Sequence, residues 1–208
     1  MFITFEGTEG SGKSFQARLL VERLRAHGLN VVATHEPGGT PLGDQLRELV
    51  LLRDDLDVSS RAEALIMNAS RAQLVDDIIR PALNRGDVVV CDRFADSTLV
   101  YQGSGRGLDI GDLSSVISFA TAGLRPDMTI LLDLPVEIGL ARKHPPDGEG
   151  WNRFEAEALA FHSRVRDGYR ALANREPARW RCLDGLPSAE KIADEIWGLV
   201  AERMEFEP

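Results

Sequence analysis

Glycines, one lysine and one hydroxyl stand at positions 7–14 with the spacing G-x-x-x-x-G-K-[S/T], in the order Gly7-Thr8-Glu9-Gly10-Ser11-Gly12-Lys13-Ser14. An apolar run at 2–5 precedes this stretch, and a helical pattern begins near Lys13. In that context glycines let backbone N–H groups approach a polyphosphate, and the helix N-terminus adds partial positive charge. Lys13 would bridge the outer phosphates and the Ser14 hydroxyl would ligate Mg²⁺. The spacing therefore predicts a loop that binds a nucleoside triphosphate.

A carboxylate and a guanidinium follow the most apolar stretch of the chain. The run 87–91 is typical of a parallel strand buried on both faces, and Asp92 and Arg93 come directly after it. An Asp-Arg pair alone is more often a surface salt bridge. At the end of a buried strand beside a phosphate loop, however, a carboxylate suits Mg²⁺ held through water. We therefore expect Asp92 to be a second, indirect ligand of the metal.

Two further groups of candidate residues lie between these motifs. The turn 35–41 follows a predicted strand at 29–34, at the strand end where open α/β sheets place their ligands, although Pro-Gly-Gly alone is more typical of a connector. Arg47 follows on a short helix that ends near residue 52. Met67 and Arg71 are four residues apart and share one face of a long helix predicted over 61–84. Ser59 or Ser60 would cap that helix, and a proline at position 81 predicts a break or kink near its end.

The elements that must position these residues alternate along the chain. Strands are predicted at 2–5, 29–34, 87–91, 128–133 and 180–183, with helices at 14–27, 61–84, 97–102, 112–122, 135–144, from 154 onward, and 188–203. This alternation predicts a five-stranded, mainly parallel sheet covered on both faces by helices. The polar groups after the first three strands would then meet at one edge. We expect one domain over 1–208, with a proline- and glycine-rich lid at about 142–155.

Composition excludes some classes of protein. A net charge of −9 argues against sequence-independent nucleic-acid binding, which needs a basic surface. No apolar stretch approaches the roughly 18 residues of a membrane span, and the chain begins directly with a strand, so we expect a cytoplasmic protein. Cys91 and Cys182 each lie in an apolar run, which predicts two buried free thiols.

Taken together, these residues resemble bacterial thymidylate kinase (dTMP kinase) over nearly the whole chain. The resemblance rests on a specific combination of short motifs: Phe5-Glu6-Gly7, Glu36-Pro37-Gly38-Gly39-Thr40, Ser70-Arg71-Ala72-Gln73, Asp92-Arg93-Phe94, Tyr101-Gln102-Gly103 with Gly105-Arg106-Gly107, and Leu132-Asp133-Leu134-Pro135. It implies the P-loop nucleoside monophosphate kinase fold, with strand order 2-3-1-4-5. It also implies a homodimer that transfers the γ-phosphate of ATP to dTMP with Mg²⁺, giving dTDP for dTTP biosynthesis.

The resemblance implies roles for the acceptor phosphate and sugar. Glu9, inside the phosphate loop, would approach the deoxyribose 3′-hydroxyl. Glu36, Arg47 and Arg93 would shape the site of the acceptor phosphate. Tyr101 would lie against the sugar, where its bulk disfavours a 2′-hydroxyl.

The resemblance also implies how the thymine ring and the transferred phosphate are held. Arg71 and Gln102 would face the thymine edge with Thr98 nearby, and Met67 would cover the ring. Family members without an arginine inside the phosphate loop supply cations from the lid instead, and Gly10 occupies that loop position here. Residues 7–14 would bind ATP, and the catalytic set implied is Lys13, Arg93, Arg142, Arg153 and Glu9.

The sequence departs from the family pattern at several positions. The family usually has a phenylalanine where this chain has Met67, followed here by Asn68, and an arginine where this chain has His35. The predicted lid is rich in proline and glycine rather than arginine, and Asn152 replaces the usual aspartate. These departures leave open a kinase for another deoxypyrimidine monophosphate, such as dUMP or a 5-substituted dUMP. A non-catalytic P-loop regulator is a further alternative, although a pure binder has no need of Arg93.

Overall fold

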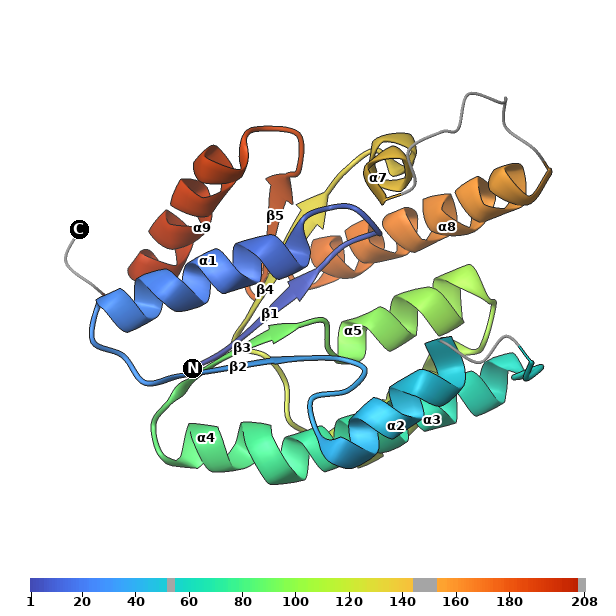
Figure 1. The fold of residues 1–208 in the computed structure, drawn as a ribbon, viewed down its shortest axis with the longest axis horizontal. Coiled ribbons are helices and arrows are strands. Elements are labelled where there is room, and N and C mark those ends of the chain that lie inside the picture. Colours follow the sequence, from blue (N-terminus) through green and yellow to red (C-terminus); the bar gives the residue numbers. More distant parts are fainter. Residues whose placement is uncertain (52–54, 144–152, 206–208) are drawn as a thin grey trace.

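A computed structural model describes residues 1–51, 55–143 and 153–205. For residues 143 and 153–158 it describes the backbone alone. Five strands form one parallel sheet: β1 (Phe2–Glu6), β2 (Val31–His35), β3 (Val88–Asp92), β4 (Met128–Asp133) and β5 (Trp180–Asp184). Their order is β2-β3-β1-β4-β5, which confirms both the predicted parallel sheet and the strand order that the resemblance implies. In this order the strand before the phosphate loop lies at the centre of the sheet (Figure 1).

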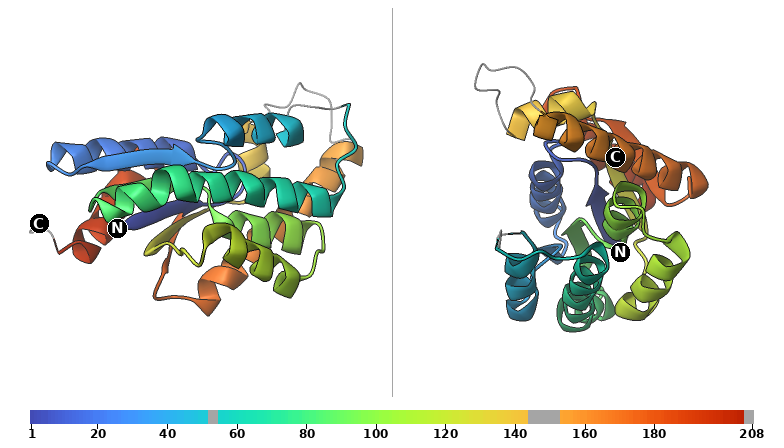
Figure 2. Two further views of the ribbon diagram at one scale, coloured as in Figure 1. Left: turned by 90° about the horizontal axis from the view of Figure 1, so that it is seen from below. Right: turned by 90° about the vertical axis from the view of Figure 1, so that its right-hand side faces the viewer.

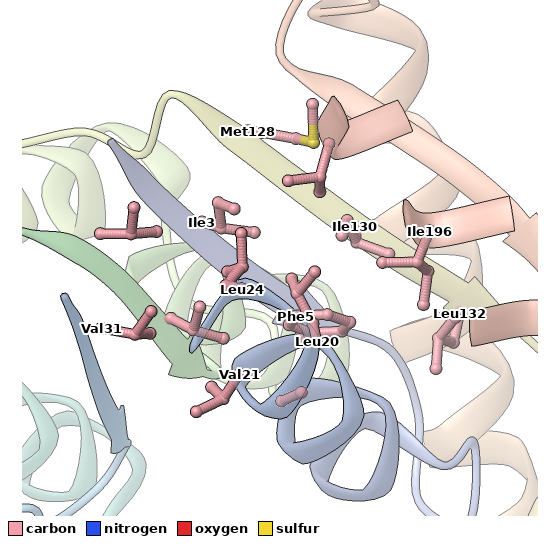
Figure 3. Packing of buried hydrophobic residues seen from close by; sticks show 14 of the residues in the cluster. Ile3, Phe5, Leu20, Val21, Leu24, Val31, Met128, Ile130, Leu132 and Ile196 are labelled. Carbon is pink, nitrogen blue, oxygen red and sulfur yellow. The ribbon is translucent and has the colours of Figure 1, made fainter. Parts of the chain in front are cut away.

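Helices cover both faces of the sheet. The described helices are α1 (Lys13–Ala26), α2 (Pro41–Leu51), α3 (Ser60–Leu74), η1 (Val75–Ile79), α4 (Arg80–Asn84), α5 (Ala95–Thr98), η2 (Leu99–Gly105), α6 (Ile110–Thr121), α7 (Val136–Lys143), α8 (Arg153–Arg175) and α9 (Ala189–Arg203). The first face packs against α1 and α9, where Ile3 and Phe5 meet Leu20, Leu24 and Ile196 (Figure 3). The second face packs against α3, η1, α4 and α8. Because both faces are covered, the central strand β1 is buried along its whole length.

The long helix predicted over 61–84 forms as one continuous run of α3, η1 and α4 (Figure 2, left). Its cap is Ser59, whose hydroxyl accepts a hydrogen bond from the Ala62 N–H at 3.4 Å. Near the end the helix widens to a π-helical segment, Val75–Ile79, directly before the turn that holds Pro81. The wider turn accommodates a residue that lacks an N–H, so the predicted break is a bulge and not an interruption.

A helix forms where one is predicted over 97–102, although with different ends, and one prediction about burial was wrong. The helix expected over 97–102 begins at Ala95 and continues through Gly103 and Gly105, because packing and not propensity decides there. A Cβ at Gly103 would lie 2.4 Å from Ile110, and one at Gly105 would lie 2.6 Å from the Phe161 ring. Cys182 is exposed on the edge strand β5, whereas Cys91 on β3 is buried as predicted.

Two other predictions concern the lid and the membrane. The lid predicted for about 142–155 falls largely on residues 144–152, which lie outside the described residues. Among the described helices, none is long and apolar enough to cross a membrane.

Candidate active site

The phosphate loop connects β1 to α1, and the side chain of Lys13 folds back to contact residues of this loop. The ammonium nitrogen donates to the Thr8 carbonyl at 2.8 Å and to the Ser11 hydroxyl at 3.2 Å. Burial lowers the pKa of Lys13 from 10.5 to about 7, and the nearby Arg93 adds to this effect. A bound polyphosphate would oppose both causes, because it brings negative charge to the ammonium group.

Glycine is required in this loop by close contacts with the rest of the fold. A Cβ at Gly7 would lie 2.6 Å from the Leu132 carbonyl oxygen, and one at Gly10 would lie 2.0 Å from that of Gly139 in α7. Conversely, a Cβ at Gly139 would lie 2.3 Å from the Glu9 carbonyl oxygen. The loop therefore rests directly on the backbone of β4 and α7, which fixes its shape.

The predicted metal ligands lie side by side. The Ser14 hydroxyl donates a short hydrogen bond to Oδ2 of Asp92, which joins the start of α1 to the end of β3. The other carboxylate oxygen, Oδ1, is buried without a hydrogen-bond partner among the described residues. A hydroxyl and an unpaired carboxylate oxygen are oxygen donors of the kind that Mg²⁺ prefers, so the residues present fit this ion.

Arg93 is held in an uncommon backbone conformation at the end of β3. Its φ of 70° lies in the left-handed region that glycine favours, which marks stored strain. Two hydrogen bonds hold this backbone: Arg93 N–H donates to the Phe5 carbonyl at 2.9 Å, and the Cys91 thiol donates to the Arg93 carbonyl at 2.9 Å. The arrangement aims the guanidinium across the end of β1 toward the phosphate loop.

Tyr101 and Glu9 both contact Nη2 of the Arg93 guanidinium. Nη2 donates to the Tyr101 hydroxyl at 3.0 Å and lies 3.4 Å from Oε1 of Glu9. The Tyr101 hydroxyl in turn donates to Glu9 at 2.8 Å, and His162 Nδ1 lies 2.9 Å from Oε2. Burial alone would raise the pKa of Glu9, but His162, Arg93 and Tyr101 together hold that pKa well below its usual value. Glu9 is therefore a charged acceptor with donors on both oxygens.

The second half of the site is centred on Arg71 of α3. Nε and Nη2 both contact Oε2 of Glu36 at 2.8 and 2.7 Å, Nη1 donates to Asn68 at 2.7 Å, and Nη2 also donates to Thr98 at 3.1 Å. Burial raises the pKa of Glu36 while Arg71 opposes the rise. The remaining oxygen of Glu36 has no partner within the described part of the chain. This network fixes the plane of the Arg71 guanidinium, and Met67 lines the same cavity.

One cavity of about 1130 Å³ joins the two halves. Most of the predicted site residues line it, namely Glu9, Gly10, Lys13, Ser14, Glu36, Arg47, Met67, Arg71, Asp92, Arg93, Thr98, Tyr101 and Gln102, whereas Gly7, Thr8, Ser11, Gly12 and Arg142 do not. Arg47 donates to the Pro37 carbonyl at 2.8 Å, and Gln102 donates to Glu63 at 2.7 Å. The polar groups at the ends of β1, β2 and β3 thus converge on one edge of the sheet, as the sequence predicts.

Known proteins are similar to this chain over nearly its whole length. Residues 5–196 match the family model described as Thymidylate kinase. The chain belongs to the thymidylate kinase family. A thymidylate kinase of Thermomicrobium roseum is 52% identical over 98% of this chain and 96% of its own length, and one of Solidesulfovibrio magneticus is 49% identical over 97% and 99%. A crystal structure of thymidylate kinase from Ehrlichia chaffeensis has a TM-score of 0.78 and 33% identity, covering 96% of this chain and 98% of that one.

Of the two arginines expected in the lid of this thymidylate kinase family member, the structure describes the side chain of only one. Arg142, near the end of α7, directs its guanidinium nitrogens to the Gly185 carbonyl at 3.3 and 3.4 Å and to the Gly10 carbonyl at 3.4 Å. Arg142 therefore contacts the phosphate loop at Gly10 but does not line the cavity. The side chain of Arg153 lies outside the described residues, so its role stays a prediction.

Sequence reasoning missed what β1, α5 and α8 contribute to this thymidylate kinase site through four residues. Glu6, Ser97, His162 and Tyr169 all contact the Glu9–Arg93 pair or its partners. Glu63 likewise holds Gln102 and forms an ion pair with Arg106 at 2.8 Å. A helical pattern makes Phe161 and Tyr169 indistinguishable from ordinary core residues, because the pattern records burial and not hydrogen-bond partners.

Proposed function

We propose that this chain transfers the γ-phosphate of ATP to dTMP, giving ADP and dTDP. One observation carries the proposal: Glu9 of the phosphate loop and Arg93 at the end of β3 lie in the same cavity as Arg71 and Thr98. That cavity has room for two phosphorylated ligands. Lys13 lies at the donor end, and the guanidinium of Arg71, which would face the edge of the thymine, lies at the acceptor end. Phosphoryl transfer depends on such positioning and on charge neutralisation more than on covalent chemistry.

At the donor end, the loop 7–14 would bind the triphosphate of ATP through its backbone N–H groups. Lys13 would neutralise charge on the outer phosphates, which accounts for a buried lysine that forms no ion pair within the described part of the chain. Ser14 would ligate Mg²⁺ directly and Asp92 through water. When bound, the ion would supply additional neutralisation of the phosphates.

At the acceptor end, Arg93, Arg47 and Glu36 would surround the phosphate of dTMP, and Glu9 would accept a hydrogen bond from the 3′-hydroxyl. Tyr101 is fixed by hydrogen bonds to Glu9 and Arg93, so its ring would form a rigid wall against the sugar. Arg71 and Gln102 would meet the thymine edge, with Thr98 beside them and Met67 covering the ring through its polarizable sulfur. Arg142 and Arg153 would supply cations near the phosphate loop, with residues of about 142–155 acting as a lid.

The experiment that tests this proposal measures ADP release with and without dTMP. We expect ADP that depends on dTMP and on Mg²⁺, and no transfer by Lys13→Ala. ADP release that ignores dTMP would refute the proposal and favour a nucleotide-binding regulator. A panel of dTMP, dUMP, 5-hydroxymethyl-dUMP and dCMP then measures selectivity, where a hundredfold preference for dTMP corresponds to about 2.7 kcal/mol.

We also propose that two copies of the chain associate through α3 and α6. These helices pack side by side, and they carry large apolar side chains in contact with solvent. Phe119 is 90% exposed, Leu65 57% and Ile110 42%. An apolar surface of this kind is typical of a protein interface. Light scattering after size exclusion should give a dimer for the wild type and a monomer for Phe119→Lys; a monomeric wild type would refute this interface.

A further inference from the structure

Glu6, the last residue of β1, is a wholly buried carboxylate to which the transfer reaction assigns no role. Oε1 accepts a hydrogen bond from the Phe94 N–H at 2.9 Å. Oε2 accepts two more, from the Ser97 hydroxyl at 2.7 Å and from the Tyr169 hydroxyl at 2.7 Å. Glu6 therefore ties together β1, the start of α5 and the helix α8.

The same two hydroxyls contact Arg93 on their other side. Nη1 of Arg93 lies 3.2 Å from the Ser97 oxygen and 3.1 Å from the Tyr169 oxygen. A guanidinium only donates hydrogen bonds and a carboxylate only accepts them. Each hydroxyl has one hydrogen, so while Glu6 is ionised the hydroxyl donates that hydrogen to Glu6 and accepts from Arg93. The two hydroxyl oxygens are 2.9 Å apart, and the carboxylate keeps both hydrogens pointing away from the arginine.

We propose that Glu6 is a positioning residue for Arg93, acting through the hydroxyls of Ser97 and Tyr169. This inference rests on the proposed function, in which Arg93 holds the acceptor phosphate. With Nη1 anchored by these two oxygens and Nη2 by Tyr101, the guanidinium plane is fixed before any substrate binds. Such preorganisation matters because a misplacement of about 1 Å in a transfer site can cost about a hundredfold in rate.

The burial of Glu6 supports this interpretation. Burial raises the pKa of Glu6 to about 7, with Asp96 adding to the rise and Arg93 opposing it. Keeping a carboxylate here is costly, whereas a glutamine of nearly the same size would be less so. A glutamine, however, places an N–H where Glu6 has only acceptor oxygens. It would donate to one hydroxyl and turn that hydrogen toward Arg93.

The test begins with Glu6→Gln in the full-length protein. We expect kcat with dTMP to fall by about ten- to a hundredfold, while the KM for ATP changes by less than about twofold because the donor loop is untouched. Tyr169→Phe and Ser97→Ala each remove one link and should lower kcat in the same direction, so the test stands even where Glu6→Gln folds poorly. Unchanged kcat in these three variants, with an active wild type, would overturn the inference and leave the proposed function standing.

A double-mutant cycle separates positioning from a structural role. In the Ser97→Ala/Tyr169→Phe background, Glu6→Gln should lower kcat by less than about threefold further, because the path to Arg93 is already cut. Fully additive losses would refute action through the hydroxyls. Thr4→Val is the matched control: it removes a buried hydrogen bond to Thr129 at 2.9 Å from the same face of β1 and should leave kcat unchanged. A wild type without dTMP-dependent activity would instead refute the proposed function.

Discussion

Replacing Lys13 with methionine should make the ligand-free protein more stable although it abolishes transfer. The side chain is only 7% exposed, and burial lowers the pKa of its ammonium group from 10.5 to about 7. Methionine has a similar length and no charge, so it removes the cost of burying the ammonium group. Lys13 is thus expected to reduce stability in return for function.

The size of the effect follows from the two pKa values. The unfolded chain keeps Lys13 charged up to about pH 10.5, whereas the folded chain releases the proton near pH 7. Between these values the unfolded state binds more protons, so wild-type stability rises with pH relative to the variant. At about 1.4 kcal/mol per pKa unit, the burial cost is about 4 kcal/mol at pH 7 and about 2 kcal/mol at pH 9.

Urea unfolding of both proteins at pH 7, 8 and 9 measures this difference, and the titrating groups that do not interact with Lys13 cancel in the comparison. The variant loses two hydrogen bonds of Lys13, each worth about 1 kcal/mol, which lowers its advantage by a similar amount at each pH. The advantage should still shrink by about 2 kcal/mol from pH 7 to pH 9. A difference that does not change with pH would refute the reasoning, as would one that grows. Lys191→Met, which removes an exposed lysine of α9, is the control and should show no such trend.

Three further substitutions test other parts of the site. Glu36→Gln breaks the buried pair with Arg71 and should lower the free energy of unfolding by about 3–5 kcal/mol, against less than about 1 kcal/mol for Glu22→Gln in an exposed pair; equal losses in urea unfolding would contradict this. His162→Phe removes a partner of the Glu9 carboxylate and should raise the KM for dTMP about tenfold but not that for 3′-deoxy-dTMP, where no 3′-hydroxyl is available; an equal rise for both would count against it. Asp92→Asn should raise the Mg²⁺ concentration needed for half-maximal turnover at least about tenfold, and an unchanged Mg²⁺ titration would remove Asp92 from the metal site.

The sequence predicts the donor half of the site better than the acceptor half, because the donor half is local. Residues 7–14 carry their strand, loop and helix with them, so spacing alone indicates the phosphate cradle. Asp92 is also accessible to prediction, since a buried strand ends directly before it. The strand order, in contrast, came from resemblance, because alternation of strands and helices is compatible with several orders.

The acceptor half depends on contacts between distant residues. Tyr169 donates to Glu6 across 163 positions of sequence, and no local pattern links the two. The helical pattern from 154 onward records recurring apolar positions and says nothing of the Tyr169 hydroxyl. The exposed Cys182 shows the same limit for burial, since an apolar run does not reveal that its strand is the last one in the sheet.

The contact between Gly10 and Gly139 restricts how this enzyme can evolve. An arginine in the phosphate loop at position 10 would meet the α7 backbone at 2.0 Å from its first side-chain carbon, and the φ of 69° is itself unfavourable for it. A larger residue at 139 would press equally on the Glu9 carbonyl. Both clashes are with backbone oxygens, which every residue carries, so a substitution at one position cannot relieve the clash at the other, and no single substitution leads from this layout to one with a loop arginine. That change requires α7 to shift at the same time, so a lineage that once adopts the paired glycines is held to cations supplied from elsewhere in the chain.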